Sequence, residues 1–181
     1  MALTESSMMT LGTVAPDFAL NDPRDGKRYA LEELMGERGT LVMFICNHCP
    51  FVKHVESALV RLGEDYRRSG IALVAISAND ADAYPEDSPE MMAQKRYPFP
   101  YLYDADQQVA RAYGAACTPD FFLFDSELRC VYRGQFDSAR PGNDAPVTGA
   151  DLRRALEALR HGEPVDKNQK PSIGCNIKWK A

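Results

Sequence analysis

The sequence predicts an α/β layer fold with a central mixed sheet flanked by helices. Two continuous apolar runs, at residues 40–45 and 71–76, have the length and composition of strands buried on both faces. A segment with helical spacing of its apolar residues lies between them. A third apolar run at 121–124 is followed by a return segment that suits an antiparallel hairpin. Strands that alternate with helices indicate this fold class, and the late hairpin adds antiparallel pairing.

The composition is that of an ordinary globular protein. The chain has 181 residues, and we expect one domain over 1–181 with a core of about 12–160 and a C-terminal tail at 162–181. A net charge of −5, without a cluster of basic residues, argues against a nucleic-acid partner. No stretch approaches the roughly 18 apolar residues of a membrane span, so we expect no membrane partner.

The first residues and the cysteine count predict the cellular location of the protein and the state of its thiols. The start, MALTESSMMT, lacks the basic and apolar regions of a signal peptide, so we expect a cytoplasmic protein. Cytoplasmic thiols are kept reduced, and a Cys-x-x-Cys is there more often catalytic or metal-binding than a structural disulfide. The five cysteines are an odd number, which does not suit a disulfide framework.

Local patterns predict the elements of the first half in order. Alternating residues at 15–20 and the segment 27–30 flank a run of turn formers, which predicts an N-terminal β-hairpin. Residues 31–35 can form a short helix. Pro50 suits the first turn of a helix after the strand at 40–45, because its missing N–H is not needed there. The apolar face of that helix consists of Val52, Val55, Leu59 and Leu62.

Capping residues predict where helices begin in the second half of the chain. After a polar loop at 79–87, Ser88 can cap an extra helical insertion. Asp104 with Gln107 resembles the capping box of a further helix. The remaining expected elements are a short strand at 99–103, the strand at 121–124, its return strand at 130–132, a last helix capped by Thr148 and Asp151, and an unpatterned tail at 162–181.

Two cysteines, Cys46 and Cys49, lie where a buried strand passes into the helix that begins at Pro50. Open α/β sheets place their sites at this end of the strands. Thiol–disulfide exchange needs an attacking thiolate with a second thiol in reach, and the N–H groups of a helix start stabilise the thiolate. His48 adds an imidazole beside the pair. We therefore expect a lowered pKa for the leading thiol, Cys46, and a more oxidising couple.

Two other interpretations of the pair remain open. Cys46 and Cys49 can be two buried cysteines in a tight turn. A zinc site would use them together with His48 or His54, but a structural zinc site needs four ligands, commonly as two pairs. The sequence contains no second Cys-x-x-Cys and no His-x-x-x-His, so we expect no metal and no other cofactor.

Three segments, at 14–20, 41–50 and 118–124, have the order and spacing of known motifs. They resemble the N-terminal APDF hairpin, the strand with its Cys-x-x-Cys, and the cis-proline segment of the thioredoxin-fold superfamily. The similarity is greatest to the branch of TlpA/ResA-like thioredoxins and peroxiredoxin-like proteins of the AhpC/TSA type. It spans about residues 12–160 and implies a thioredoxin-like fold.

The resemblance assigns roles to particular residues. It implies that Cys46 is the attacking cysteine and Cys49 the resolving one, with Asn47, His48 and Pro50 in support. It also implies a cis peptide bond before Pro119. The backbone of Thr118, just before that proline, is expected to pair with a substrate chain.

The sequence departs from these relatives at several positions. Thr40 stands where thioredoxins carry a buried acid. Asn47-His48 replaces their Gly-Pro, and the histidine has the same position as in the oxidising DsbA proteins. If Cys49-Pro50 is instead a peroxidatic Cys-Pro pair, Val42 and Cys46 replace the expected Pro and Thr.

Two further cysteines are candidate accessory thiols. Cys117 lies two residues before Pro119, and it can be near the pair or can be a small buried hydrophobic residue. Cys175 lies in a tail that resembles the C-terminal segment of a peroxiredoxin-like group. Its thiol can attack an oxidised active-site cysteine, or the tail can simply pack on the body.

The leading functional hypothesis is a thiol–disulfide oxidoreductase. Its expected partners are a protein or small-molecule disulfide or thiol substrate and an electron donor that the sequence does not identify. The alternatives are a peroxiredoxin-like thiol peroxidase and a non-catalytic, redox-responsive binding protein of the same fold. Replacing either cysteine discriminates, because turnover depends on the thiols and partner binding need not.

Overall fold

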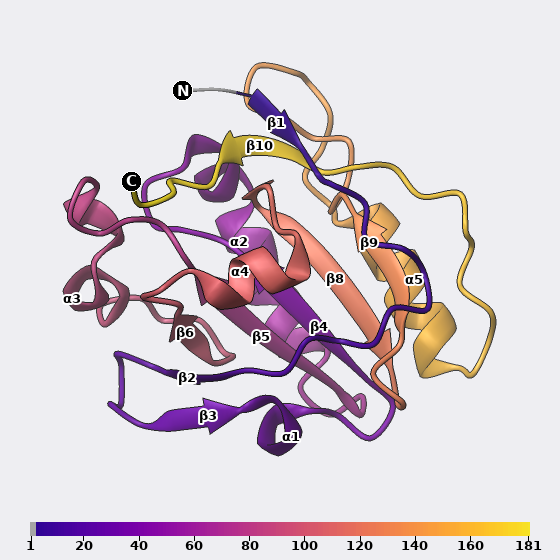
Figure 1. Cartoon of the computed structure of the whole chain (residues 1–181). Helices are drawn as coiled ribbons and strands as arrows, with labels where there is room; N and C mark the ends of the chain where they lie inside the picture. The colour runs from indigo at the N-terminus through magenta and orange to yellow at the C-terminus, as the bar shows by residue number, and fades with distance from the viewer. Residues whose placement is uncertain (1–2) are drawn as a thin grey trace.

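A seven-stranded mixed sheet forms the centre of the computed structural model, which describes residues 3–181 (Figure 1). The strand order is β3-β2-β6-β5-β4-β8-β9. Central strand β4 pairs in parallel with β5 and antiparallel with β8. The strands are β2 (Ala19–Asn21), β3 (Arg28–Ala30), β4 (Gly39–Phe44), β5 (Ile71–Ser77), β6 (Tyr101–Tyr103), β8 (Asp120–Asp125) and β9 (Cys130–Gly134). The predicted α/β class, the N-terminal hairpin of β2 and β3, and the late hairpin of β8 and β9 are confirmed.

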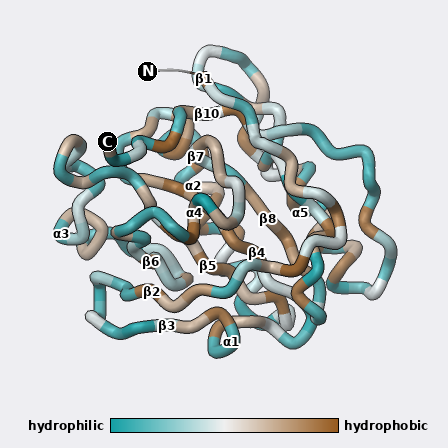
Figure 2. The backbone as a smooth tube through the Cα atoms, viewed as in Figure 1, coloured by the Kyte–Doolittle hydropathy of each residue, from teal (hydrophilic) through white to brown (hydrophobic). Residues whose placement is uncertain are grey.

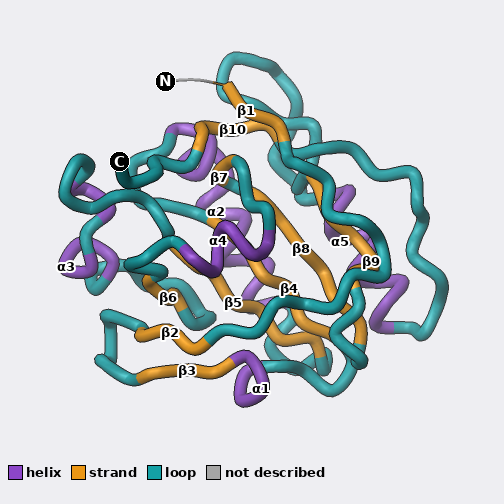
Figure 3. Tube along the Cα trace, in the orientation of Figure 1, coloured by secondary structure: helices purple, strands orange, loops and turns teal. Residues whose placement is uncertain are grey.

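Helices cover both faces of this sheet (Figure 3). Leu41 and Met43 of β4 face the core that includes α2 and α5, whereas the alternate residues Val42 and Phe44 face the core that includes α4. The continuous apolar character of β4 thus follows from burial on both sides. The helices are α1 (Leu31–Leu34), α2 (Pro50–Asp65), α3 (Pro89–Met92), α4 (Gln108–Tyr113) and α5 (Ala150–Arg160), with a 3₁₀ turn at Pro85–Asp87.

A second, three-stranded sheet lies at one end of the molecule, above the start of α2 in Figure 1. Its order is β1-β10-β7, with β1 at Leu3–Glu5, β10 at Ile173–Asn176 and β7 at Cys117–Thr118. The expectation of an unpatterned C-terminal tail is therefore wrong for β10. Its strand is too short to show a sequence period, and its pairing partners come from both halves of the chain.

Two predicted helix starts differ in the structure. Asp104 does not begin a capping box; its carboxylate accepts the N–H groups of Val109 and Ala110, and Gln107 adopts a left-handed conformation before α4 begins. The last helix, α5, has Gly149 in a left-handed conformation as its cap, rather than Thr148 or Asp151. The predicted cap at Ser88 is confirmed, because its side chain accepts the N–H of Met91, but the helical insertion that it begins is only the four residues of α3.

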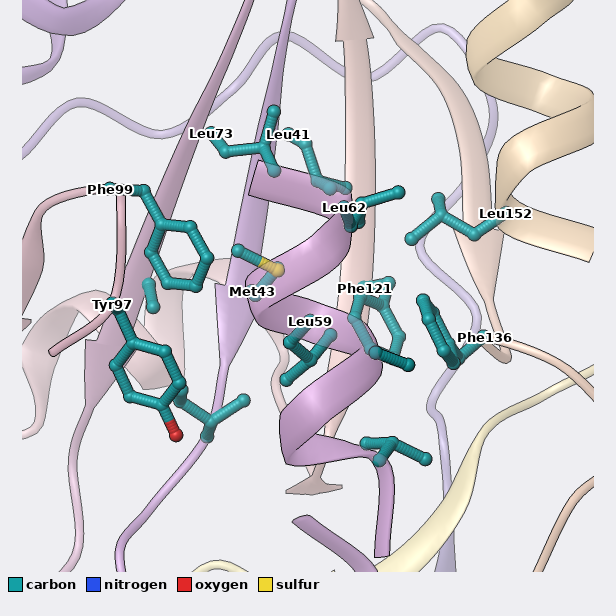
Figure 4. Close-up of a cluster of buried hydrophobic side chains, with 14 of the residues drawn as sticks. Leu41, Met43, Leu59, Leu62, Leu73, Tyr97, Phe99, Phe121, Phe136 and Leu152 are labelled. Carbon is teal, nitrogen blue, oxygen red and sulfur yellow. The ribbon is translucent and has the colours of Figure 1, made fainter. Parts of the chain in front are cut away.

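Hydrophobic residues gather along the central strands (Figure 2). In Figure 4, Leu59 and Leu62 of α2 lie against Leu41 and Met43 of β4, and all four side chains are fully buried. This contact fixes α2, and with it the position of its first turn, over the sheet. Among the described residues, no helix is both long enough and apolar enough to cross a membrane.

Replacing Leu59 by alanine should lower the free energy of unfolding by about 2–5 kcal/mol, because it leaves a cavity between α2 and the sheet. Urea denaturation followed by circular dichroism measures this. Arg61→Ala on the exposed face of the same helix is the matched control and should change stability by less than about 0.5 kcal/mol. Equal effects of the two changes would contradict the packing described here.

Candidate active site

The pairing of β4 with β8 brings two loops together at the start of α2. Phe44 at the end of β4 is opposite Asp120 at the start of β8. The residues that follow β4 therefore lie beside those that precede β8, namely Thr118 and Pro119. The Thr118–Pro119 peptide bond is cis, as the sequence predicts. Pro50 occupies the first helical turn of α2, also as predicted.

The thiols of Cys46 and Cys49 hydrogen-bond to each other and to Thr118. Cys46 Sγ lies 3.6 Å from Thr118 Oγ1, and Cys49 Sγ lies 3.4 Å from the Thr118 carbonyl oxygen. The hydrogen bond between the two sulfurs has a large effect on both pKa values. The structure thus brings together the predicted pair and the predicted cis-proline segment.

Both thiols are covered, and a third sulfur lies beside them. Cys46, Cys49 and Cys175 are 1%, 0% and 1% exposed. Cys175 belongs to β10, which pairs with β7 so that Cys175 is opposite Thr118. Its side chain hydrogen-bonds to Cys49. The tail therefore packs on the body and also places its thiol in the site.

The other two cysteines lie outside this cluster. Cys117 is adjacent to Thr118 on β7, and its sulfur faces the carbonyl oxygens of Pro119 and Ser172, at 3.6 and 4.0 Å. Burial raises the pKa of its thiol well above the usual range. Cys130 on β9 is buried in the core that includes α4, and burial raises its pKa to about 11. Both residues have the environment of small buried hydrophobic side chains.

Asp87 organises the turn between the two cysteines, and sequence reasoning did not identify it. This fully buried carboxylate accepts the backbone N–H groups of Asn47 and His48, at 2.7 and 3.1 Å, and the amide of Asn79 at 2.9 Å. It also pairs with Nδ1 of His48, whose ring stacks on Tyr84 with the centroids 5.3 Å apart. The only sequence signal was an acid in a polar loop.

The predicted support from Asn47 has a clear structural form. Its side-chain oxygen accepts the hydroxyl of Tyr101 at 2.8 Å, and its side-chain nitrogen donates to the carbonyl of Glu86 at 2.9 Å. Both contacts are buried or partly buried. Asn47 therefore ties the turn that follows β4 to β6 and to the 3₁₀ turn, which holds the two cysteines in place.

The expected lowering of the Cys46 pKa is wrong in this structure. The hydrogen bond to Cys49 raises the pKa of Cys46, and burial and the charge of Asp87 act in the same direction. The helix begins at Pro50, so the residue that caps it is Cys49 rather than Cys46. His48 points its ring nitrogen at Asp87, whose negative charge offsets that of an imidazolium.

The pKa of Cys49 is lowered instead. The largest cause is the hydrogen bond from the Cys46 thiol, followed by those from Cys175 and Thr118 and from the backbone N–H of Val52, while burial opposes them. The Thr118 carbonyl is the one close group that favours the protonated thiol. Four donors outweigh it, so the neighbours of Cys49 favour its thiolate form.

One group of side chains has the geometry for a metal ion. Ligand atoms of Cys46, His48 and Asp87 lie within 4.8 Å of one another. The carboxylate oxygens of Asp87 already bond to Asn47, His48 and Asn79. Among the described residues, this group contains Cys46 and His48 of the zinc interpretation but not Cys49.

Asp120 is a second buried acid that sequence reasoning missed, although it directly follows Pro119. It accepts the hydroxyl of Ser6 at 2.8 Å and the N–H groups of Phe121 and Ala116 at 3.2 and 3.4 Å. Burial nevertheless raises its pKa to about 7. The contact with Ser6 joins the N-terminal segment to the cis-proline loop.

A cleft on the surface and the cysteines occupy different parts of the molecule. A cleft of about 550 Å³ lies between α5 and residues 163–170, and none of the cysteines lines it. The chemistry of the site therefore involves a covered cluster of thiols rather than an open pocket.

The sheet, α2 and the cis-proline strand define a protein of thioredoxin-like fold. The chain belongs to the AhpC/TSA family, whose profile matches residues 11–133. A crystal structure of an uncharacterized conserved protein from Geobacillus kaustophilus is 58% identical, with a TM-score of 0.98 over 99% of this chain and 97% of that one. Peroxidoxin BcpB from Mycobacterium tuberculosis shares the fold at 20% identity, with a TM-score of 0.63 over 85% of this chain and 98% of that one.

A curated relative extends the likeness over most of the chain. Thiol-disulfide oxidoreductase ResA from Geobacillus thermodenitrificans (strain NG80-2) is 25% identical over 158 residues. These residues are 87% of this chain and 82% of the relative. The predicted resemblance to ResA-like and peroxiredoxin-like proteins is thus confirmed.

The reduced protein should contain one cysteine thiolate at neutral pH, and that thiolate should belong to Cys49. Ultraviolet thiolate absorbance, followed from acid to alkaline pH, measures it. Cys49→Ala should abolish the absorbance at pH 7, because burial and the charge of Asp87 still raise the pKa of Cys46 after its hydrogen bond to Cys49 is lost. Cys130→Ala is the matched control and should leave it unchanged. A thiolate that survives in Cys49→Ala and disappears in Cys46→Ala would contradict this assignment.

Asp120 should make the wild-type protein lose stability as the pH rises from about 4 to about 7. Because its folded pKa is raised from 3.8 to about 7, the folded state binds the proton more tightly, and that stabilisation is complete only below the unfolded pKa. It is lost as the pH rises through the folded pKa, by up to about 4 kcal/mol. Urea denaturation of wild type and Asp120→Asn across this range measures the difference.

The Asn variant should show a flatter stability profile between the same two pH values. Exposed Asp144→Asn is the control and should keep the wild-type slope. Parallel profiles for wild type and Asp120→Asn would show that Asp120 titrates with an ordinary pKa.

Proposed function

We propose that the protein is a thiol–disulfide oxidoreductase whose redox couple is Cys46 and Cys49. The observation that carries the proposal is the hydrogen-bonded pair of thiols at the start of α2, facing Thr118 and the cis peptide bond. Membership of the AhpC/TSA family and the likeness to a relative named thiol-disulfide oxidoreductase support it.

We infer different tasks for the two thiols. Cys49, as the thiolate, accepts the proton of Cys46 across their hydrogen bond, which makes Cys46 the nucleophile. The Cys46 sulfur attacks one sulfur of a substrate disulfide, and the other sulfur leaves as a thiol with the proton from Cys49. The Cys49 thiolate then attacks Cys46 and releases the second substrate sulfur as a thiolate, which takes a proton from water. The enzyme loses two electrons, and the substrate disulfide is reduced to two thiols.

The substrate is a protein or small-molecule disulfide. An extended chain would pair with the backbone of Thr118, but β10 occupies that edge in this structure. A protein substrate therefore has to displace β10, because the residue that attacks is covered. A small disulfide needs a smaller opening, which makes it the first substrate to test.

A thiol peroxidase is the second candidate, and the position of Cys49 favours it. A cysteine with a lowered pKa at the N-cap position of a helix, directly before a proline, has the placement of a peroxidatic cysteine. Its attack on a peroxide would give an alcohol or water and a sulfenic acid on Cys49. The Cys46 thiol would then condense with that group to form the disulfide and release water.

Cys46→Ala and Cys49→Ala should each lower the turnover of a disulfide such as oxidised glutathione by about a thousandfold or more, because the two thiols act as one unit. Steady-state consumption of an added thiol reductant measures this, with hydrogen peroxide tested in parallel as the alternative oxidant. Cys130→Ala should retain wild-type turnover.

The outcomes separate the three functions. Turnover on peroxide but not on disulfides would favour the peroxidase. A wild-type protein that turns over neither substrate, yet still forms the disulfide between Cys46 and Cys49, would favour a redox-responsive binding protein. Undiminished turnover in both cysteine variants would overturn the proposed site.

A further inference from the structure

We propose that Cys175 is a third redox thiol, which forms a disulfide with Cys49 in competition with Cys46. The proposal rests on the redox function proposed for Cys46 and Cys49, and it adds a residue from the C-terminal tail to their chemistry. Cys49 is then the central sulfur of the cluster, with one disulfide partner on each side.

The position of Cys175 depends on an unusually close backbone contact. A side chain at the preceding residue, Gly174, would place its Cβ only 2.0 Å from the carbonyl oxygen of Thr118. Real Cβ atoms are not found this close to a backbone atom, so glycine is required for β10 to lie on β7 in this register. The neighbouring Cys175 then pairs with Thr118, whose carbonyl also lies 3.4 Å from Cys49 Sγ.

Contacts on both sides of Cys175 hold the tail in this position. The hydroxyl of Ser172 donates to the carbonyl of Pro119 at 2.6 Å, and β1 pairs with the other edge of β10. Beyond β10, the Lys178 N–H donates to Asn79 Oδ1 at 2.9 Å, and Arg111 lies over the ring of Trp179 at 4.4 Å. The sulfur is therefore held in the site by its neighbours.

The neighbours of Cys175 place its thiol against Cys49 and the first turn of α2. Its side chain hydrogen-bonds to Cys49, and the N–H of Phe51 in the first turn of α2 favours its thiolate. Burial is the larger effect and raises the pKa of Cys175 to about 12. Cys175 therefore holds its proton in the reduced state and can pass it to a leaving thiolate during exchange.

The place of Cys175 is that of a substrate cysteine. The family resemblance puts a substrate chain on the backbone of Thr118, and here the protein's own strand β10 takes that edge with a cysteine opposite Thr118. The tail thus has the arrangement of an internal substrate.

The exchange step balances without any further reactant. Starting from the disulfide between Cys46 and Cys49, the Cys175 sulfur attacks Cys49. A bond between Cys49 and Cys175 forms, the bond between Cys46 and Cys49 breaks, and Cys46 leaves with the proton that Cys175 gives up. No electrons enter or leave, so the two disulfides are isomers of one oxidised state, and the second isomer restores a Cys46 thiol for another attack.

Disulfide mapping tests the proposal on the full chain. Wild type and variants are equilibrated with oxidised and reduced dithiothreitol, the remaining thiols are alkylated, and peptide mass spectrometry identifies the pairs. In wild type, the disulfide between Cys49 and Cys175 should make up at least about one-tenth of the oxidised protein. Cys46→Ala should still lose two thiols and form this disulfide alone, and Cys46→Ser serves as a second variant in case the first folds poorly.

Two variants and a control distinguish the contribution of the C-terminal tail from that of Cys46 and Cys49. Cys175→Ala should confine oxidation to Cys46 and Cys49. Gly174→Ala keeps every thiol but forces β10 off Thr118, so it should lower the Cys49–Cys175 disulfide about tenfold or more while Cys46–Cys49 persists. Cys130→Ala should match wild type.

The readouts distinguish this inference from the proposed function. If the Cys46 variants keep all their thiols where wild type oxidises, Cys175 is not a redox partner and the proposal is overturned, while the function of Cys46 and Cys49 stands. If wild type forms only the Cys49–Cys175 disulfide and shows no turnover, the inference holds and the proposed function fails.

Discussion

The antiparallel pairing of β4 with β8 is the constraint on which the thiol cluster depends. It aligns the end of one strand with the start of the other, so the turn after Phe44 meets the cis-proline loop. The packing of α2 on the same sheet then fixes where the helix begins, with Cys49 as its cap. Two buried cores, one on each face, hold these three elements together. The register of the sheet therefore determines which residues meet at the site.

The pKa values of the two thiols depend on the charged and hydrogen-bonding groups around the start of α2. Cys49 collects donors from two thiols, a hydroxyl and a backbone N–H, whereas Cys46 faces the carboxylate of Asp87. A thiolate on Cys46 would add a second negative charge to a buried region that already holds that carboxylate. One negative charge on the thiol pair, located on Cys49, is the arrangement that this set of neighbours favours. His48 pairs with this carboxylate, and its ring nitrogen also lies within 4.8 Å of the Cys46 sulfur.

Sequence patterns predicted the parts of the fold that have a period or a cap. The buried strands and the helix that begins at Pro50 were of this kind, whereas the cis bond before Pro119 was predicted from the family resemblance. Asp87 could not be predicted, because a buried acid and a solvated acid look alike in a polar loop and only its four donors reveal the difference. The pairing of β10 was equally hidden. Its one signal is Gly174, and a glycine in a tail indicates a close contact only when the opposite strand is known.

The strand β10 is synthesised after all the other elements of the thiol site. Everything that forms the Cys46–Cys49 pair, from β4 to the cis-proline loop and β8, precedes residue 130, whereas Cys175 lies in the last strand described. A nascent chain therefore has a two-thiol site with an unoccupied edge at Thr118 before the third thiol exists. The pairing of β10 with β7 therefore changes an exposed pair of thiols into a covered one, and it can occur only after the rest of the site has been synthesised.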